Sequence, residues 1–366
     1  MVDLPKANPP KQAWIRKGDV QSVSAAATPK QLTPEQKQER LTERDHYSDE
    51  ARQLFADGKF DEAIAAAEKM LTIEQKVLGN DDPDAIGSRR YLATLHQAKG
   101  DLAGAHKLGE EELARSTSLL GKDHWQVTDA RLALADVDIL AGLKSEDRQA
   151  LAHCDAAFGK AQRLNATGDP KSALPLLKEV LEARTRLLGP KHRLTGVTCS
   201  WLGVIYEHLG KSADAVTFAS QSLGIAKDVY GEHHPNYASS LDNLAVLYRE
   251  NADYAKAEPL CRQALQIRKE LLGEKDPDYA RSLNNLAWLY ELSGNYAKAE
   301  PLLLEGAEIR KQALGEKHHD YAQSLCSVAV LFKEMASTPR PSRCTSRYYR
   351  LIRKRWAKRI PTMQLI

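Results

Sequence analysis

The chain lacks the short motifs on which catalysis and membrane insertion commonly depend. No glycine-rich phosphate loop, no G-x-S-x-G nucleophile motif and no H-E-x-x-H helix occurs in its 366 residues. Apolar runs fall short of the roughly 20 residues that cross a bilayer, and the opening MVDLPKANPPKQAWIRKG has no apolar segment of the kind a secretory signal needs. We therefore expect a cytoplasmic protein that is not an enzyme and uses no cofactor.

Aromatic residues and closely spaced cysteines are also scarce. Aromatics make up 6% of the sequence, and no two of the five cysteines form a C-x-x-C pair. Several of these cysteines recur at apolar helix positions, so we expect reduced, partly buried thiols rather than a disulfide framework or a metal site. The cysteines are Cys154, Cys199, Cys261, Cys326 and Cys344.

Positive charge is concentrated at one end of the chain. The formal net charge is +3, but residues 337–366 hold nine Arg or Lys and no acid, which leaves the rest of the chain mildly acidic. A nucleic-acid-binding surface needs clustered Lys and Arg on the folded part. The charge distribution therefore excludes a nucleic-acid binder built from the whole chain.

What the chain does have is an internal repeat. The segment GEHHPNYASSLDNLAVLYRENADYAKAEPLCRQALQIRKELL is followed by GEKDPDYARSLNNLAWLYELSGNYAKAEPLLLEGAEIRKQAL. Turn glycines recur every 42 residues, at Gly189, Gly231, Gly273 and Gly315, and the pair Gly79 and Gly121 has the same spacing. Such a period indicates a repeat array in which each unit packs only on its neighbours.

Each repeat shows two apolar stripes of helical period. In one unit Leu241, Leu244, Ala245 and Tyr248 share the first stripe, and the second begins at Ala257. The four-residue breaks ENAD and LSGN allow only a tight turn, and proline in the first turn favours the start of the next pair. The sequence therefore predicts pairs of antiparallel amphipathic helices.

The spacing of the small residues resembles the pattern of a known family. Ala245, Ala257 and Ala264, together with Leu241, Tyr248 and Tyr254, follow the large, Leu-small, Tyr, Gly, Tyr, Ala, Ala pattern of tetratricopeptide repeats. The 42-residue period and the phrases SLNNLA, YAKAEPL and LGEKDPDYA are similar to the repeats of kinesin light chains and related bacterial proteins. The resemblance implies an all-α solenoid of helix pairs wound into a right-handed superhelix. A HEAT-type solenoid of similar period lacks the signature.

The spacing fails once. Gly121 and Gly189 lie 68 residues apart, one helix short of two units, with helices expected near 124–141, 146–166 and 170–187. We expect a crossing linker or a flip of packing there, hence a bend in the solenoid. The expected organisation is a disordered polar leader (1–44), N-terminal repeats (45–122), an irregular region with one missing helix (123–188), regular repeats (189–336) and a basic tail (337–366).

The basic tail interrupts the last repeat. Codons can be chosen for Met335–Arg347 such that one added base yields MGEYAKAEPLYKQ, the missing helix of that repeat. We therefore interpret residues 336–366 as a frameshifted stretch of a longer array. The alternative is a basic amphipathic helix, with Tyr348, Ile352 and Trp356 on one stripe, that binds anionic lipid or nucleic acid.

In the family that the chain resembles, the first helix of each pair lines a concave groove. In that family, asparagines of the phrase SLNNLA hold the backbone of an extended peptide, and the resemblance implies the same for Asn243, Asn284 and Asn285. Asparagine suits this role because its amide both donates hydrogen bonds to and accepts them from a peptide unit. Trp288 could supply an apolar anchor. The residues expected in this peptide-binding groove are Ser239, Asp242, Asn243, Arg249, Arg281, Asn284, Asn285, Trp288, Glu291, Gln323, Ser327 and Lys333.

Two other interpretations of these residues stay open. Asparagine and arginine are ordinary on a solvated helix face, and the asparagines could simply bridge adjacent repeats. The pairs His233–His234 and His318–His319 could gather a metal, but surface turn residues are the more usual case.

The residues favour a protein-interaction scaffold that binds a peptide or helix. The alternative is the sensor arm of a protease- or kinase-linked signalling enzyme whose effector is missing from this chain. The partner is expected to be a protein, with no nucleic acid and no membrane unless the basic tail is genuine.

Overall fold

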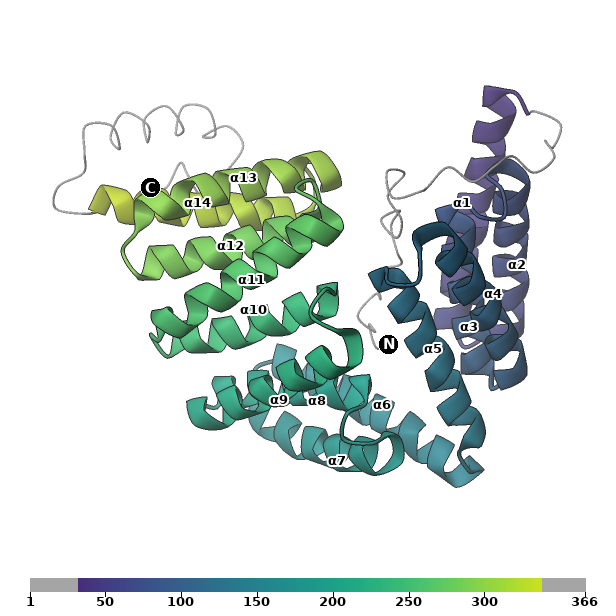
Figure 1. Cartoon of the computed structure of the whole chain (residues 1–366), viewed down its shortest axis with the longest axis horizontal. Coiled ribbons are helices and arrows are strands. Elements are labelled where there is room, and N and C mark those ends of the chain that lie inside the picture. Colours follow the sequence, from purple (N-terminus) through teal and green to yellow (C-terminus); the bar gives the residue numbers. More distant parts are fainter. Residues whose placement is uncertain (1–31, 338–366) are drawn as a thin grey trace. The chain divides into compact units, whose positions relative to one another are not determined.

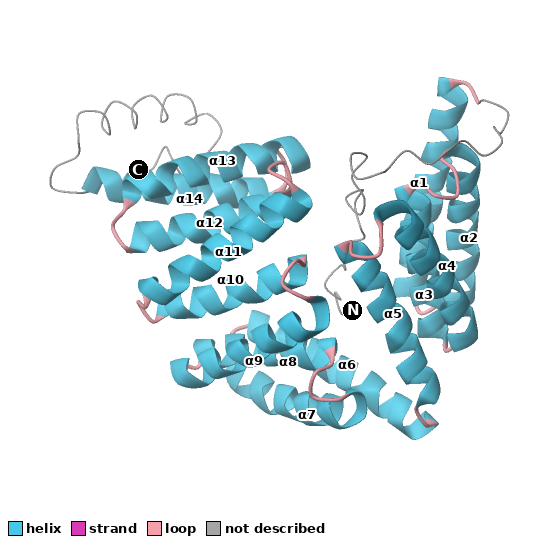
Figure 2. Cartoon of the chain, in the orientation of Figure 1, coloured by secondary structure: helices cyan, strands magenta, loops and turns pink. Residues whose placement is uncertain are grey.

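The computed structural model describes residues 32–337, which form 14 helices and no strands (Figures 1 and 2). The chain divides into two compact units, Met1–Arg148 and Gln149–Ile366. None of the described helices is both long and apolar enough to span a bilayer. The architecture is the predicted solenoid of packed helix pairs.

In the first unit, consecutive helices pack in order. They are α1 (Pro34–Ala56), α2 (Phe60–Val77), α3 (Pro83–Lys99), α4 (Leu102–Leu120) and α5 (Trp125–Gly142), and α6 (Ser145–Ala166) begins at the end of this unit. Their core contains Ala63, Ala67, Leu92 and Leu95.

The second unit continues the pattern through eight more helices, which Figure 1 shows following one another in chain order. They are α7 (Pro170–Leu188), α8 (Arg193–His208), α9 (Ser212–Tyr230), α10 (Pro235–Glu250), α11 (Tyr254–Leu272), α12 (Pro277–Leu292), α13 (Tyr296–Leu314) and α14 (His319–Ser337). We call α8, α10, α12 and α14 first helices, and α7, α9, α11 and α13 second helices.

Small side chains allow the helices to approach closely, as their spacing predicts. Ala245, Ala257, Ala264, Ala287 and Ala299 are all at most 1% exposed. In α8 a glycine takes the equivalent place, and a Cβ on Gly203 would come within 3.2 Å of a backbone oxygen of α9. Because larger residues would push the helices apart, these positions fix the helix packing.

The turn inside each pair requires a left-handed residue. In the second unit this residue is Gly168, Gly210, Ala252 or Gly294, with φ between 57° and 84°. Glycine adopts this conformation without a Cβ clash, whereas Ala252 is the only non-glycine residue with positive φ in the described part of the chain. The turn after α10 is therefore the strained one.

The N-terminal boundary differs from the expected one. Helix α1 begins at Pro34 rather than near residue 45, because Thr33 and Gln36 form a reciprocal capping box. The first turns of this helix are polar, so hydrophobic periodicity could not reveal them.

At the C-terminal end, the frameshift hypothesis and the rival basic helix concern residues that, from 338 onward, lie outside the described range. The predicted bend also stays a prediction.

Candidate interaction surface

The first helices of the second unit are linked by polar contacts between residues 40 to 43 positions apart in the sequence. The Nδ2 of Asn243 in α10 donates to Ser200 Oγ in α8 at 2.9 Å. The Nη2 of Arg281 in α12 lies 3.4 Å from Ser239 Oγ in α10, and Asn284 Nδ2 lies 3.4 Å from Ser324 Oγ in α14. These contacts hold α8, α10, α12 and α14 side by side.

A row of apolar residues crosses these four helices. Val204, Val246, Trp288 and Val330 occupy the same place in successive repeats, 42 residues apart, and none of them is buried. Trp288 is 38% exposed and Val330 is 49% exposed. The guanidinium of Arg249 lies 5.1 Å from the centre of the Trp288 ring, which supports the indole from the neighbouring helix. We call this row and the exposed polar residues beside it the first-helix surface.

Several predicted site residues lie on the first-helix surface. Asn243, Arg281, Trp288, Gln323 and Lys333 are exposed, and Ser239, Asn285 and Glu291 are half-buried. The amide of Asn285 forms no hydrogen bond with any residue that the structure describes. It therefore has its donor and acceptor available.

Four other predicted site residues are buried in the packing between repeats. Asp242, Arg249, Asn284 and Ser327 are each at most 9% exposed. Asp242 forms an ion pair with the buried Arg268 of α11 at 2.5 Å, and Asn284 bridges α12 and α14. Asn243 also bridges repeats, so the structural interpretation of the asparagines holds for two of the three.

Sequence reasoning missed the arginines behind this surface. Arg184 in α7, Arg268 in α11 and Arg310 in α13 occupy the same place in their helices, and all are at most 6% exposed. Arg184 donates to Asp155 Oδ1 at 2.6 Å and to Thr198 Oγ1 at 2.8 Å. The recurrence of a charged residue at an otherwise apolar helix position was the available signal, since buried arginine requires partners.

Glu291 lies beside the apolar row in an unfavourable setting for its charge. Burial raises the pKa of its carboxyl, and the nearby Glu334 raises that pKa further. Cys154, Cys199 and Cys261 are free and buried, as expected, whereas Cys326 is free and exposed. Burial raises the pKa of Cys199 to about 11 and that of Cys261 to about 12, which keeps these thiols protonated and unreactive.

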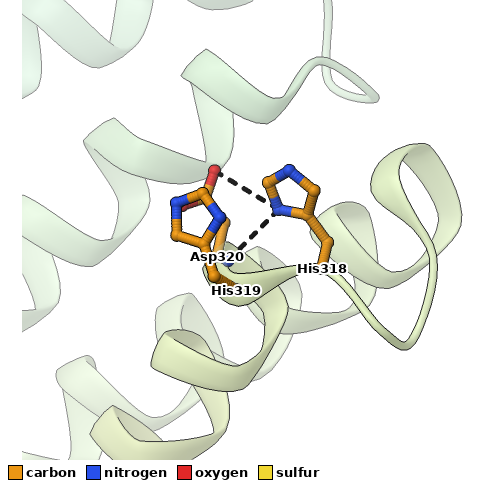
Figure 3. Close-up of side chains that lie close together, drawn as sticks. All are labelled: His318, His319 and Asp320. Carbon is orange, nitrogen blue, oxygen red and sulfur yellow. Dashed lines mark hydrogen bonds and ion pairs between the residues drawn. The ribbon is translucent and has the colours of Figure 1, made fainter. Parts of the chain in front are cut away.

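The turn before α14 brings three possible metal ligands together (Figure 3). Ligand atoms of His318, His319 and Asp320 lie within 4.8 Å of one another, and His319 Nε2 is 2.8 Å from Asp320 Oδ1. However, His318 Nδ1 already accepts the backbone N–H of Asp320 at 3.2 Å. His192 and His234 cap α8 and α10 in the same way, so His318 has a structural role at this position.

The packed helix pairs and their interhelical contacts define a helical repeat protein with an extended open surface. Two family models, both described as tetratricopeptide repeat, match the chain. One covers residues 45–118, 197–258 and 243–312, which is more than half of the chain, and the other covers residues 160–194. The chain belongs to the tetratricopeptide repeat family. A comparison with curated proteins finds no match.

Solved structures similar to this chain include kinesin light chain-like repeat proteins, the type expected from the sequence. BtubC (BKLC) from P. vanneervenii is 24% identical over 70% of this chain and 92% of its own, with a TM-score of 0.40. A putative kinesin light chain from Podosopora anserina with nearly identical repeats is 22% identical over 62% and 95%, with a TM-score of 0.38. A signal transduction ATPase from Pyrococcus horikoshii with a tetratricopeptide repeat sensor is 16% identical over 86% and 53%, with a TM-score of 0.41.

Proposed function

We propose that the chain is a protein-interaction scaffold that binds an extended peptide or a helix of a partner protein across its first-helix surface. The observation that carries this proposal is the apolar row on α8, α10, α12 and α14. Val204, Val246, Trp288 and Val330 stay accessible to solvent, although the next residue in each helix, Ile205, Leu247, Leu289 or Leu331, is buried. A row of this kind is what a partner segment with regularly spaced apolar side chains would cover.

The polar residues beside the row suit the recognition of a main chain. Asn285 can donate to a peptide carbonyl and accept from a peptide N–H. Arg281 and Gln323 occupy the equivalent place in α12 and α14, and both are exposed. Trp288 combines a large apolar area with a ring already held by Arg249, so little side-chain freedom is lost when a partner binds.

Selection of peptides from a displayed random library against the full chain tests the proposal. Peptides that bind should lose at least about tenfold in affinity with Trp288→Ala, which removes the central apolar anchor. The matched control is Gln312→Ala, an exposed change on the second helix α13, and it should leave affinity unchanged. Equal affinity of every selected peptide for the wild type and Trp288→Ala, or no selected peptide at all, would contradict the proposal.

A further inference from the structure

Six of the described helices are capped by a residue that stands three places after a turn glycine. In each of them a side-chain atom of this residue accepts the backbone N–H two residues further on. The helices are α3, α5, α8, α10, α12 and α14, and their caps are Asp82, His124, His192, His234, Asp276 and His318. The same bond is therefore made by a carboxylate in two helices and by an imidazole in four.

The two kinds of cap differ in their response to acid. In α12 the acceptor is a carboxylate oxygen of Asp276, at 2.8 Å, whereas in α10 it is Nδ1 of His234, at 3.1 Å. An imidazole Nδ1 accepts only while it carries no proton. Histidine ordinarily takes up a proton between about pH 5 and 8, whereas an aspartate carboxylate stays ionised down to about pH 4. Mild acid therefore acts on the histidine caps alone.

Protonation of such a cap has two effects on its helix. Nδ1 becomes a donor that faces another donor, so the capping bond is lost. The new positive charge also lies at a helix N-terminus, where the peptide dipoles already place partial positive charge. The cap thus contributes stability that is present at neutral pH and lost as the pH falls.

The cap of α10 is the most enclosed of the histidine caps in the second unit. His234 is 1% exposed, and its ring stacks on that of Tyr230 at the end of α9, with centroids 4.5 Å apart. His192 and His318 are half-buried. Because burial disfavours a charged side chain, a proton on His234 costs more than a proton on the other two.

The charged groups around the α10 cap are of both signs, and its carboxylate neighbours have partners. Glu232 in the same turn pairs with Lys227 of α9, and Glu270 of α11 lies 3.7 Å from Nδ1 of His233. The corresponding ends of α8 and α12 carry Arg193 and Asp278, and Asp278 pairs with Arg281. The burial of His234 therefore decides its response.

The other two caps have different neighbours. His192 follows Lys191, which pairs with Asp228 of α9, and Arg184 of α7 donates to the first turn of α8. His318 stands beside its own carboxylate neighbour, because Asp320 Oδ2 is 3.7 Å from Nδ1 (Figure 3), while the ring of His319 lies 4.5 Å away and Arg310 of α13 donates to the Asp320 backbone. Since a carboxylate favours the charged ring, α14 should respond less than α10.

We propose that the histidine caps make the first-helix surface sensitive to mild acid. Three of the four helices that carry this surface, α8, α10 and α14, begin at a histidine, and Asp276 holds the fourth. Ser239 and Gln323 lie in the second turn after their caps. A loosened helix start presents such residues less rigidly, so a partner has more freedom to immobilise. Only this consequence rests on the proposed function; the loss of the caps does not.

Hydrogen exchange of the full chain without any partner tests the caps directly. Protection factors, corrected for the intrinsic effect of pH on exchange, are compared at about pH 7.5 and about pH 5.5, on either side of the histidine range. Amides in the first two turns of α10 should lose about fivefold in protection, which corresponds to one cap. The same turns of α12 are the internal control. No loss in α10, or an equal loss in α12, would overturn the inference.

Two exchanges of caps provide matched variants. His234→Asn keeps a side-chain acceptor that does not titrate in this range, so it should abolish the acid response of α10. Asp276→His should confer a response on α12. An acid response of α10 that survives His234→Asn, or an α12 that stays as protected in Asp276→His as in the wild type, would contradict the assignment.

Selected peptides without ionisable side chains test the consequence for binding. Their affinity for the wild type should fall by about fivefold at the lower pH, and by less for His234→Asn. Glu291 is present in both proteins, so its own titration cancels in this comparison. If peptides that need Trp288 bind equally at both pH values, the acid sensitivity of the surface is wrong and the proposed function stands. If no peptide depends on Trp288, the proposed function fails, while hydrogen exchange still decides whether the caps respond to acid.

Discussion

At the scale of single residues, the same helix position carries different charges in different repeats. Arg268 has Asp242 as its partner, whereas in the repeat of Arg310 the residue equivalent to Asp242 is the neutral Asn284. Removing one member of a buried ion pair leaves the other charge uncompensated, whereas removing an unpaired charge does not. The two arginines should therefore respond in opposite ways to the same substitution.

We expect Arg268→Met to destabilise the second unit by about 3–5 kcal/mol, because the carboxylate of Asp242 stays buried without its cation. Arg310→Met should be within about 1 kcal/mol of the wild type, or stabilising, since it leaves no carboxylate behind. Urea unfolding of the two variants, followed by hydrogen exchange of α11 and α13, measures both effects. A larger loss for Arg310→Met than for Arg268→Met would contradict this assignment.

Glu291 should make the stability of the chain depend on pH. Burial raises the pKa of its carboxyl in the folded chain above its ordinary value of 4.5, so ionisation destabilises the fold as the pH rises through the folded pKa. Glu291→Gln removes this charge and should stabilise the chain at pH 7 by less than about 1 kcal/mol. At a pH well below 4.5 the wild-type carboxyl is protonated in both states, and the difference should vanish.

Unfolding by urea at the two pH values gives this comparison. Glu250→Gln is the matched control, because Glu250 is exposed and bonded to Arg249. It should not gain stability at pH 7. A stabilisation by Glu291→Gln that is as large at low pH as at neutral pH would rule out ionisation as its cause.

At the scale of helices and turns, the turn between α10 and α11 departs from its relatives. Ala252 has φ 57° where Gly210 and Gly294 have 69° and 74°. An L-residue in this region costs about 1–2 kcal/mol, and glycine avoids that cost at the expense of greater freedom when unfolded. Ala252→Gly should therefore stabilise the α10–α11 pair by about 0.5–1 kcal/mol.

Hydrogen exchange of the amides near the turn, together with the unfolding midpoint in urea, measures this gain. The reciprocal change Gly294→Ala, in the turn between α12 and α13, should destabilise its own pair by a comparable amount. A loss of stability in Ala252→Gly would mean that the turn is not strained.

Sequence reasoning predicted best the helix pairs, because the residue pattern that defines a pair lies within one repeat. Alternation of large apolar residues, small residues and turn glycines within one repeat is enough to define a helix pair, since each unit packs only on its neighbours. The start of α1 at Pro34 was missed because its first turns are polar. A capping signal, rather than hydrophobic period, marks that end.

The surface residues were predicted less completely, for a physical reason. Periodicity indicates which side of a first helix faces away from its own second helix, and Trp288, Arg281 and Gln323 do lie exposed there. It does not show that Asp242 meets Arg268, 26 residues further along the chain, or that Asn284 bridges to α14. The first contact depends on how the two helices of a repeat pack, and the second on how one repeat stacks on the next, which no single helix pattern contains.

At the scale of the whole molecule, an array of linked first helices presents one extended surface, and we infer that partner recognition takes place there. The sensor-arm alternative remains a prediction, because it depends on an effector beyond this chain. Coding DNA sequenced beyond Met335 tests it together with the frameshift hypothesis. An open shifted frame with further repeats would support the frameshift, and an effector domain encoded after those repeats would support the sensor arm.

The most direct test of the central inference is photo-crosslinking of a selected peptide to the full chain, with mass spectrometry to locate the modified residues. The account predicts crosslinks on the exposed sides of α10, α12 and α14, near Asn243, Trp288 and Val330. Trp288→Ala should reduce the yield, and Gln312→Ala should not. Crosslinks confined to the second helices or to the first unit would contradict the account.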